Sequence, residues 1–182
     1  MLKVMKEKKD IPKDIPIMDF GCGTGQVARD FSKEGFTDFV GLDGSAKMLD
    51  IAKKEGLYKE LHQGMLGEGK LPEELKGRFK LAVSTGCFTW GHAPFCTFDE
   101  MISSLTGEEG DILIFSIRDD QYLETGYGEY LKKLAEGGTI RFVHEEKYDR
   151  YTNIKKEDCE EGSFITPRSG YIVWYEHTGK KA

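Results

Sequence analysis

The chain has 182 residues, a length that favours one domain and leaves little room for a second. Its 26 Lys and Arg against 32 Asp and Glu give a net charge of -6, which disfavours nucleic acid and anionic membranes as partners of the whole surface. Hydrophobic residues make up 38% of the chain, as expected for a globular fold. Glycine is frequent, with 22 residues against a usual share of about 7%.

Signals for export, membrane insertion and metal binding are weak. Residues 1–14 are rich in Lys without an apolar centre, so we expect no secretory signal, and the apolar run 112–117 is far shorter than the about 20 residues that span a membrane. No CxxC pair occurs, and the cysteines lie far apart at Cys22, Cys87, Cys96 and Cys159. We therefore expect no disulfide framework, no metal site and a reducing intracellular location, the cytoplasm.

Short runs rich in β-branched residues alternate with helical patterns, which predicts a wound α/β sheet. Strands are expected at 15–20, 37–42, 58–63, 79–85, 111–117, 139–145 and 171–177. Helices are expected at 26–34, 45–56, 98–105 and from Tyr127 to the Gly137–Gly138 pair. The run 111–117 is the most apolar and should be central, because strands covered on both faces are continuously hydrophobic. Residues 1–182 form one expected domain, with 1–14 as a short N-terminal segment.

A glycine-rich loop, Asp19-Phe20-Gly21-Cys22-Gly23-Thr24-Gly25, lies between the first expected strand and the first expected helix. Glycines allow sharp turns and a close approach of a ligand to the backbone, and the following helix start offers N–H groups without helical partners. A dinucleotide fingerprint, GxGxxG/A, would need a small residue where this chain has Gln26. We therefore favour a ligand loop of another kind over a plain structural turn.

With an acid two residues before its first glycine, this loop resembles the (D/E)xGxGxG loop of class I S-adenosylmethionine-dependent methyltransferases. The resemblance implies that the loop cradles the methionine part of the cofactor, and that Asp19 anchors its amino end indirectly. Asp43 closes the second expected strand, where an acid can accept hydrogen bonds from ribose hydroxyls. A plain turn aspartate is the alternative for Asp43. Met48 or Leu49 could cover the adenine, although core packing is the simpler role for both.

Three further stretches are similar to the Williams–Beuren-region methyltransferase-like proteins: FTDFVGLDGS at 36–45, TGCFTWGHAP at 85–94 and FSIRDD at 115–120. The resemblance runs from about 17 to 175. It implies a Rossmann-like domain with a seven-stranded, mostly parallel sheet, its last strand antiparallel, and helices on both faces. It also implies a cofactor site for S-adenosylmethionine and its product S-adenosylhomocysteine, made by Asp19, Gly21, Cys22, Gly23, Gly25, Asp43, Gly44, Met48, Met65, Leu66 and Thr85.

Two features depart from that pattern. Many class I enzymes have an acid after the third strand that binds the adenine amine, and Met65 stands in that place here. A backbone N–H and C=O could read the adenine instead. Only about fourteen residues precede the first expected strand, so a helical cover over the cofactor is very short or missing.

Candidate catalytic residues follow the fourth and fifth expected strands: His92, Asp119 and Asp120. Methyl transfer depends mainly on positioning, and a base can remove the acceptor's proton. Imidazole suits that task near neutral pH, but His92 could equally cap the next helix. Aromatic rings in this region could hold a flat acceptor; we favour core packing for Phe88 and leave both roles open for Trp90.

The sequence thus predicts methyl transfer from S-adenosylmethionine to a small molecule or a protein side chain. The alternative is a non-catalytic methyltransferase-fold subunit or scaffold, part of a larger assembly, with weak or no cofactor binding. A nicotinamide-dependent oxidoreductase is disfavoured by Gln26. Nucleic acid is an unlikely acceptor because no basic stripe occurs. For the acidic run 157–161 we favour a solvated loop over a binding site for basic peptides.

Overall fold

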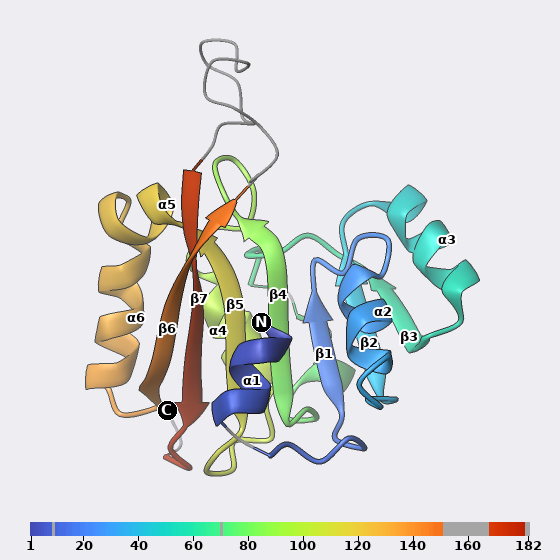
Figure 1. Cartoon of the computed structure of the whole chain (residues 1–182), viewed down its shortest axis with the longest axis horizontal. Coiled ribbons are helices and arrows are strands. Elements are labelled where there is room, and N and C mark those ends of the chain that lie inside the picture. Colours follow the sequence, from blue (N-terminus) through green and yellow to red (C-terminus); the bar gives the residue numbers. More distant parts are fainter. Residues whose placement is uncertain (9, 70, 151–167, 181–182) are drawn as a thin grey trace, which may run out of the picture.

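The computed structural model describes residues 1–8, 10–69, 71–150 and 168–180. One seven-stranded sheet crosses it in the order β3-β2-β1-β4-β5-β7-β6 (Figure 1). The strands are β1 (Ile17–Phe20), β2 (Phe39–Asp43), β3 (Tyr58–Gln63), β4 (Leu81–Phe88), β5 (Ile112–Arg118), β6 (Ile140–Arg150) and β7 (Arg168–His177). The helices are α1 (Leu2–Lys8), α2 (Gln26–Ser32), α3 (Ala46–Glu55), α4 (Thr97–Ser104), α5 (Asp119–Glu124) and α6 (Tyr127–Glu136), with a 3₁₀ turn η1 (Glu73–Leu75).

The strand directions confirm the predicted topology. Strands β1 to β5 pair in parallel, and β7 is antiparallel to both of its neighbours, β5 and β6. The chain passes from β3, at one edge, to β4, on the other side of β1. Such a reversal of winding opens a crevice at the carboxyl ends of the strands, where wound α/β sheets bind ligands. The fold therefore places the site near the ends of β1 and β4.

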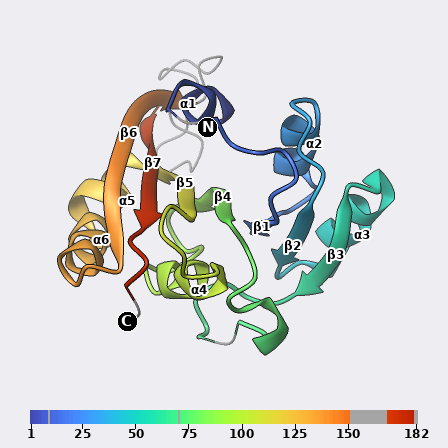
Figure 2. The ribbon, with the colours of Figure 1, turned by 90° about the horizontal axis from the view of Figure 1, so that it is seen from below.

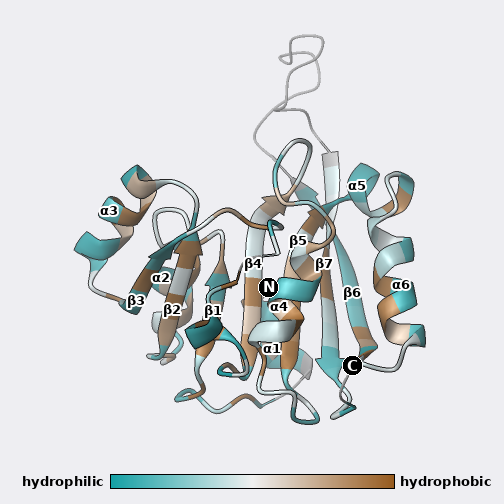
Figure 3. Cartoon of the chain, turned by 180° about the vertical axis from the view of Figure 1, so that it is seen from behind, coloured by the Kyte–Doolittle hydropathy of each residue, from teal (hydrophilic) through white to brown (hydrophobic). Residues whose placement is uncertain are grey.

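Helices cover both faces of the sheet, with α1 and α2 on one side and α4 and α6 on the other (Figure 2). Because side chains alternate along a strand, β1 directs Ile17 toward α2 and Met18 toward α4. The strands β4 and β5 carry long hydrophobic stretches, whereas the edge strand β6 is mostly hydrophilic (Figure 3). This difference fits a buried sheet centre and a solvated edge. The described part of the chain has no helix that is long and apolar enough to cross a membrane.

The structure adds three features to the predicted elements. Residues 1–14, expected only as a short segment, contain α1, whose Val4 and Met5 are buried against the sheet. A short helix, α5, follows β5 where only strand-end residues were expected. Strand β4 continues past its predicted end through an irregular stretch, because Ser84 pairs with Phe115 but Phe88 pairs with Ile117. The acidic run 157–161 lies outside the described residues.

The irregular stretch of β4 carries two extra residues relative to β5. Gly86 lies within it at φ +75°, and its N–H donates to Ser116 Oγ at 2.9 Å. Such bulges re-aim side chains beside active sites. Here the bulge returns Phe88 to the core, where it is 1% exposed and stacks on Phe98 with the ring centroids 4.4 Å apart. The prediction that Phe88 packs in the core is confirmed.

Substitution of Phe88 tests how far the core fixes the end of β4. Phe88→Ala should lower the free energy of unfolding by about 3–5 kcal/mol, because it leaves a cavity among buried rings. Phe142→Ala, on the edge strand, should cost less than about 1.5 kcal/mol, since that side chain is 51% exposed. Urea denaturation followed by circular dichroism measures both values. Equal losses for the two variants would contradict the assigned packing.

Candidate active site

A cavity of about 470 Å³ opens at the carboxyl ends of the parallel strands, within the 300–1,000 Å³ typical of ligand pockets. It lies at the reversal of winding described above. Its walls are formed by Gly21, Asp43, Gly44, Ser45, Met48, Met65, Leu66, Cys87, Gly91, His92 and Ala93. Six of the predicted cofactor-binding residues and one predicted catalytic residue are among them.

The glycine loop reaches this cavity through Gly21, which is one of its lining residues. Gly21, Gly23 and Gly25 all have positive φ, at +69°, +53° and +88°. A Cβ on Gly21 would overlap the Cys87 sulfur. The loop is tied to β2 because the N–H groups of Gly21 and Cys22 both donate to the Leu42 carbonyl, at 2.7 and 3.1 Å. Glycine at Gly21 is thus required by both backbone conformation and space.

Asp43 joins the glycine loop to the turn after β2. Its Oδ2 accepts from the Gly23 N–H at 2.9 Å, and its Oδ1 accepts from the Ser45 N–H at 2.8 Å. Ser45 caps α3, with its side chain accepting from the Met48 N–H at 3.4 Å. Each carboxylate oxygen has a second lone pair, and Asp43 lines the cavity. Asp43 is therefore both a turn aspartate and a possible acceptor for ligand hydroxyls.

Asp19 lies below the loop and is fully buried. Its Oδ2 accepts a 2.6 Å hydrogen bond from the Tyr58 hydroxyl, while Oδ1 is buried with no partner in the structure. Burial raises the pKa of Asp19 to about 7, although the Tyr58 bond opposes that rise. A buried carboxylate oxygen without a hydrogen-bond partner lowers the stability of the unliganded protein. Its position beside the glycine loop is consistent with a site where a polar ligand or a water molecule supplies the hydrogen bond.

Sequence reasoning missed Tyr58. Its ring approaches two glycines: a Cβ would lie 3.2 Å from the ring at Gly25 and 3.0 Å from it at Gly41. Gly41 sits inside β2, and a glycine within a strand often marks such a close approach. That glycine was the available signal, but it does not identify which side chain fills the space.

The remaining predicted cofactor residues do not all reach the cavity. Gly44, Met48, Met65 and Leu66 line the cavity, whereas Cys22 is buried behind the loop. Met65 is 63% exposed at the rim, and a Cβ on Gly44 would overlap its sulfur. Leu49 packs in the core side of α3, so Met48 is the residue of the pair that faces the cavity.

Thr85 departs from the prediction. It lines a different cavity, beside α1 and α2, with Gln26 and Val27. The reason is strand alternation, because Thr85 continues the face of β4 that carries Leu81 and Val83 toward those helices. The structure gives Cys87 the cavity position that was predicted for Thr85. The bulge in β4 turns Cys87 there, an effect that no sequence pattern indicated.

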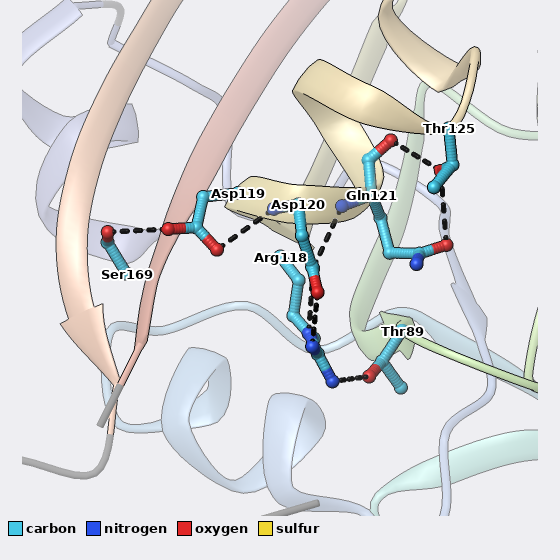
Figure 4. Close-up of polar contacts among 7 residues, drawn as sticks. All are labelled: Thr89, Arg118, Asp119, Asp120, Gln121, Thr125 and Ser169. Atoms are coloured by element: carbon cyan, nitrogen blue, oxygen red, sulfur yellow. Dashed lines mark hydrogen bonds and ion pairs between the residues drawn. The ribbon is translucent and has the colours of Figure 1, made fainter. Parts of the chain in front are cut away.

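Only one of the three predicted catalytic residues reaches the cavity. His92 is in its wall, whereas Asp119 and Asp120 are not among the lining residues. Asp119 accepts from Ser169 Oγ at 2.8 Å, and Asp120 forms a two-point ion pair with Arg118 (Figure 4). Both aspartates are therefore engaged in contacts within the protein, and their positions do not support a catalytic role for either.

One thiol, that of Cys87, belongs to the cavity wall. Cys87 is half-buried, and burial raises its pKa to about 11, so its thiol is neutral at physiological pH. Within the described residues, Cys22, Cys87 and Cys96 are free thiols, and no group of three His, Cys, Asp or Glu side chains could hold a metal ion. The cavity offers one carboxylate, one imidazole, backbone amides and apolar walls.

That donor set fits an adenosine ligand with a charged amino acid tail. A carboxylate at Asp43 can bind a ribose, apolar walls at Met48 and Leu66 can cover an adenine, and glycines permit close approach of the backbone. The unpartnered oxygen of Asp19 lies below the same loop. S-adenosylmethionine has these parts, so the residues present fit the cofactor that the loop predicts.

Replacement of Gly21 separates spatial from conformational requirements. Gly21→Ala should lower the free energy of unfolding by about 1–3 kcal/mol more than Gly86→Ala, because both positions have positive φ but only Gly21 would meet the Cys87 sulfur. Calorimetric unfolding measures the difference. Adding Cys87→Ala should recover part of the loss. Equal effects at the two glycines would refute the crowding at Gly21.

The buried Asp19 carboxyl should make stability depend on pH. Because its pKa is about 7 in the folded chain and 3.8 ordinarily, the folded chain holds more protons between these values, and its stability falls as pH rises. Asp19→Asn should therefore gain about 3 kcal/mol over the native chain on going from pH 5 to pH 8. Tyr58→Phe should steepen the native decline. Urea unfolding at both pH values checks this, and a constant difference would contradict it.

Comparison with known proteins identifies a family and several relatives of this chain. Residues 17–107, half of the chain, match a family described as methyltransferase domain. Methyltransferase-like protein 27 of Homo sapiens is 36% identical over 90 residues, which cover 50% of this chain and 36% of that protein. Juvenile hormone acid O-methyltransferase of Drosophila melanogaster is 32% identical over 104 residues, covering 54% of this chain and 35% of that protein.

The chain therefore spans little more than a third of the length of these two relatives. A crystal structure of an S-adenosylmethionine-dependent methyltransferase from Mesorhizobium loti has the same fold, with a TM-score of 0.66, 20% identity and 96% of both chains covered. These findings agree with the glycine loop and the topology. The chain belongs to the methyltransferase domain family and has the fold of a class I S-adenosylmethionine-dependent methyltransferase.

Proposed function

We propose that the chain binds S-adenosylmethionine in the 470 Å³ cavity and transfers its methyl group to a small, largely apolar acceptor. The observation that carries the proposal is the joint position of the glycine loop and Asp43 at the carboxyl ends of β1 and β2. One hydrogen bond, from the Gly23 N–H to Asp43, connects them. This arrangement supports adenosine binding more directly than any feature of the acceptor side.

In this proposal different residues of the cavity wall bind different parts of the cofactor. Asp43 accepts from ribose hydroxyls, Met48 and Leu66 enclose the adenine, and the backbone at Gly21 approaches the methionine part. Asp19, buried below the loop, favours the cationic amino end through its charge. When bound, S-adenosylmethionine supplies a methyl group on a sulfonium centre that is ready for in-line displacement.

The acceptor side favours a largely apolar molecule. Cys87 and Ala93 form this part of the wall, and among the lining residues described there is no Lys or Arg. Trp90 precedes the lining residue Gly91 in the chain and is 61% exposed. The name of the relative juvenile hormone acid O-methyltransferase also supports a small molecule as the acceptor. We prefer this class to protein side chains.

His92 is the proposed general base. It is the catalytic candidate in the cavity wall, and imidazole removes protons well near neutral pH. The remainder of the rate gain would come from orientation, since displacement at the methyl carbon requires the acceptor atom in line with the breaking bond. Apolar walls also keep water away from the electrophilic methyl group. The alternative, a non-catalytic subunit, rests on the wide exposure of Met65 at the rim.

Cofactor binding is tested by isothermal titration with S-adenosylmethionine and S-adenosylhomocysteine. We expect both to bind below millimolar concentration, and Asp43→Ala to weaken binding by at least about tenfold through loss of charged hydrogen bonds. Asp50→Ala, on the exposed face of α3, is the matched control and should leave affinity unchanged. If neither ligand binds the native chain at millimolar concentration, the proposed function is wrong.

Catalysis is tested with a panel of apolar carboxylic acids, phenols and amines and with cofactor labelled in its methyl group. His92→Gln should reduce the rate on the best acceptor by about 100-fold or more, as expected for loss of a general base. The affinity for S-adenosylhomocysteine should change less than about twofold. Cofactor binding without transfer to any member of the panel would favour the non-catalytic alternative.

A further inference from the structure

Arg118, at the end of β5, is an almost buried cation that has no role in the proposed reaction as described above. Its side chain is 9% exposed. The guanidinium donates from Nε to Asp120 Oδ1 at 2.9 Å and from Nη2 to the other carboxylate oxygen (Figure 4). Asp120 is itself fixed, because its Oδ1 also accepts from the Gln121 N–H at 2.9 Å. The start of α5 therefore sets the direction of the guanidinium.

The third arm of this guanidinium reaches the loop after β4. Arg118 Nη1 lies 3.4 Å from Thr89 Oγ1, a hydroxyl that can accept from it (Figure 4). Thr89 also closes a compact turn: its N–H donates to the Cys87 carbonyl at 2.9 Å, and its carbonyl accepts from the His92 N–H at 3.2 Å. The position of Thr89 thus determines where the backbone of His92 lies.

The other end of the turn is fixed from a different element. The Tyr127 hydroxyl, at the start of α6, donates to the Ala93 carbonyl at 2.9 Å, and the Ala93 N–H donates to the Cys87 carbonyl at 3.2 Å. Between the two anchored ends lie Trp90, Gly91 and His92, of which the last two line the cavity. Gly91 has φ +72° and open space around it, so it does not restrain the turn by packing.

We propose that Arg118 is a positioning residue: held by Asp120, it fixes the Thr89 end of the turn and so places His92 in the cavity wall. The role assigned to His92 rests on the proposed function. Asp120, predicted as a catalytic residue, then acts through Arg118 instead of on the acceptor. Lysine cannot replace Arg118 here, because a single ammonium lacks the planar fork that binds both carboxylate oxygens while a third arm reaches Thr89.

Amide hydrogen exchange of the unliganded chain measures the restraint directly. Thr89→Val removes the hydroxyl but keeps the shape, and Thr89→Ser keeps the hydroxyl. We expect exchange of the His92 and Ala93 amides to become at least about threefold faster in Thr89→Val and in Arg118→Lys, and to stay native in Thr89→Ser. Arg78→Met, which breaks a two-point Arg–Glu pair with Glu60 on another part of the surface, is the control.

Native exchange at these amides in both Thr89→Val and Arg118→Lys would overturn the proposal, even if one of the variants were less stable overall. A second readout links the restraint to the reaction. With the best acceptor, Thr89→Val should lower kcat by about tenfold while the Kd for S-adenosylhomocysteine changes less than about twofold. Loss of cofactor affinity with kcat unchanged would also count against it. Because the exchange measurement needs no cofactor, failure of the native chain to bind one would refute the proposed function alone.

Discussion

The hydrogen bond from the Gly23 N–H to the Asp43 carboxylate is the interaction on which the site depends. It brings the loop after β1 against the turn after β2, and the same carboxylate holds the turn through the Ser45 N–H. The loop can reach this position only because Gly21 has no Cβ to meet Cys87. The Asp43 carboxylate and the absence of a side chain at Gly21 thus shape this part of the cavity.

The two halves of the cavity, which the proposed function assigns to the cofactor and to the acceptor, are organised differently. The cofactor half is built mainly from backbone that is fixed by its own sheet, and Asp19 and Tyr58 form a buried polar contact beneath it. The acceptor half depends on side chains from more distant elements, namely Arg118 at the end of β5 and Tyr127 at the start of α6. This division accounts for a cofactor site that follows a family pattern and an acceptor wall that depends on individual side-chain contacts.

The sequence predicted the succession of strands and the glycine loop because both follow from local signals, namely short apolar runs and the spacing of Gly21, Gly23 and Gly25. The seven-stranded sheet with an antiparallel last strand was implied by the family resemblance. Asp43 was predictable for the same reason, since it ends a strand one helix after the loop. Cys87 was missed because the bulge in β4 is a tertiary feature set by pairing with β5. Thr85 lines the other cavity because it continues the β4 face that carries Leu81 and Val83. Sequence periodicity does not specify which side chains from different segments meet, or how neighbouring side chains are oriented. The contacts of Arg118, Asp120 and Tyr58 are of these kinds, so they could be found only from the structure.

The central claim is that this cavity holds S-adenosylmethionine by its adenosine part and presents the methyl group toward His92. A crystal structure of the chain with S-adenosylhomocysteine tests it most directly. The account predicts ribose hydroxyls on the Asp43 carboxylate, adenine between Met48 and Leu66, and the sulfur on the side of the turn that carries His92. A nucleoside bound elsewhere, or one in the cavity with its ribose away from Asp43, would contradict the account.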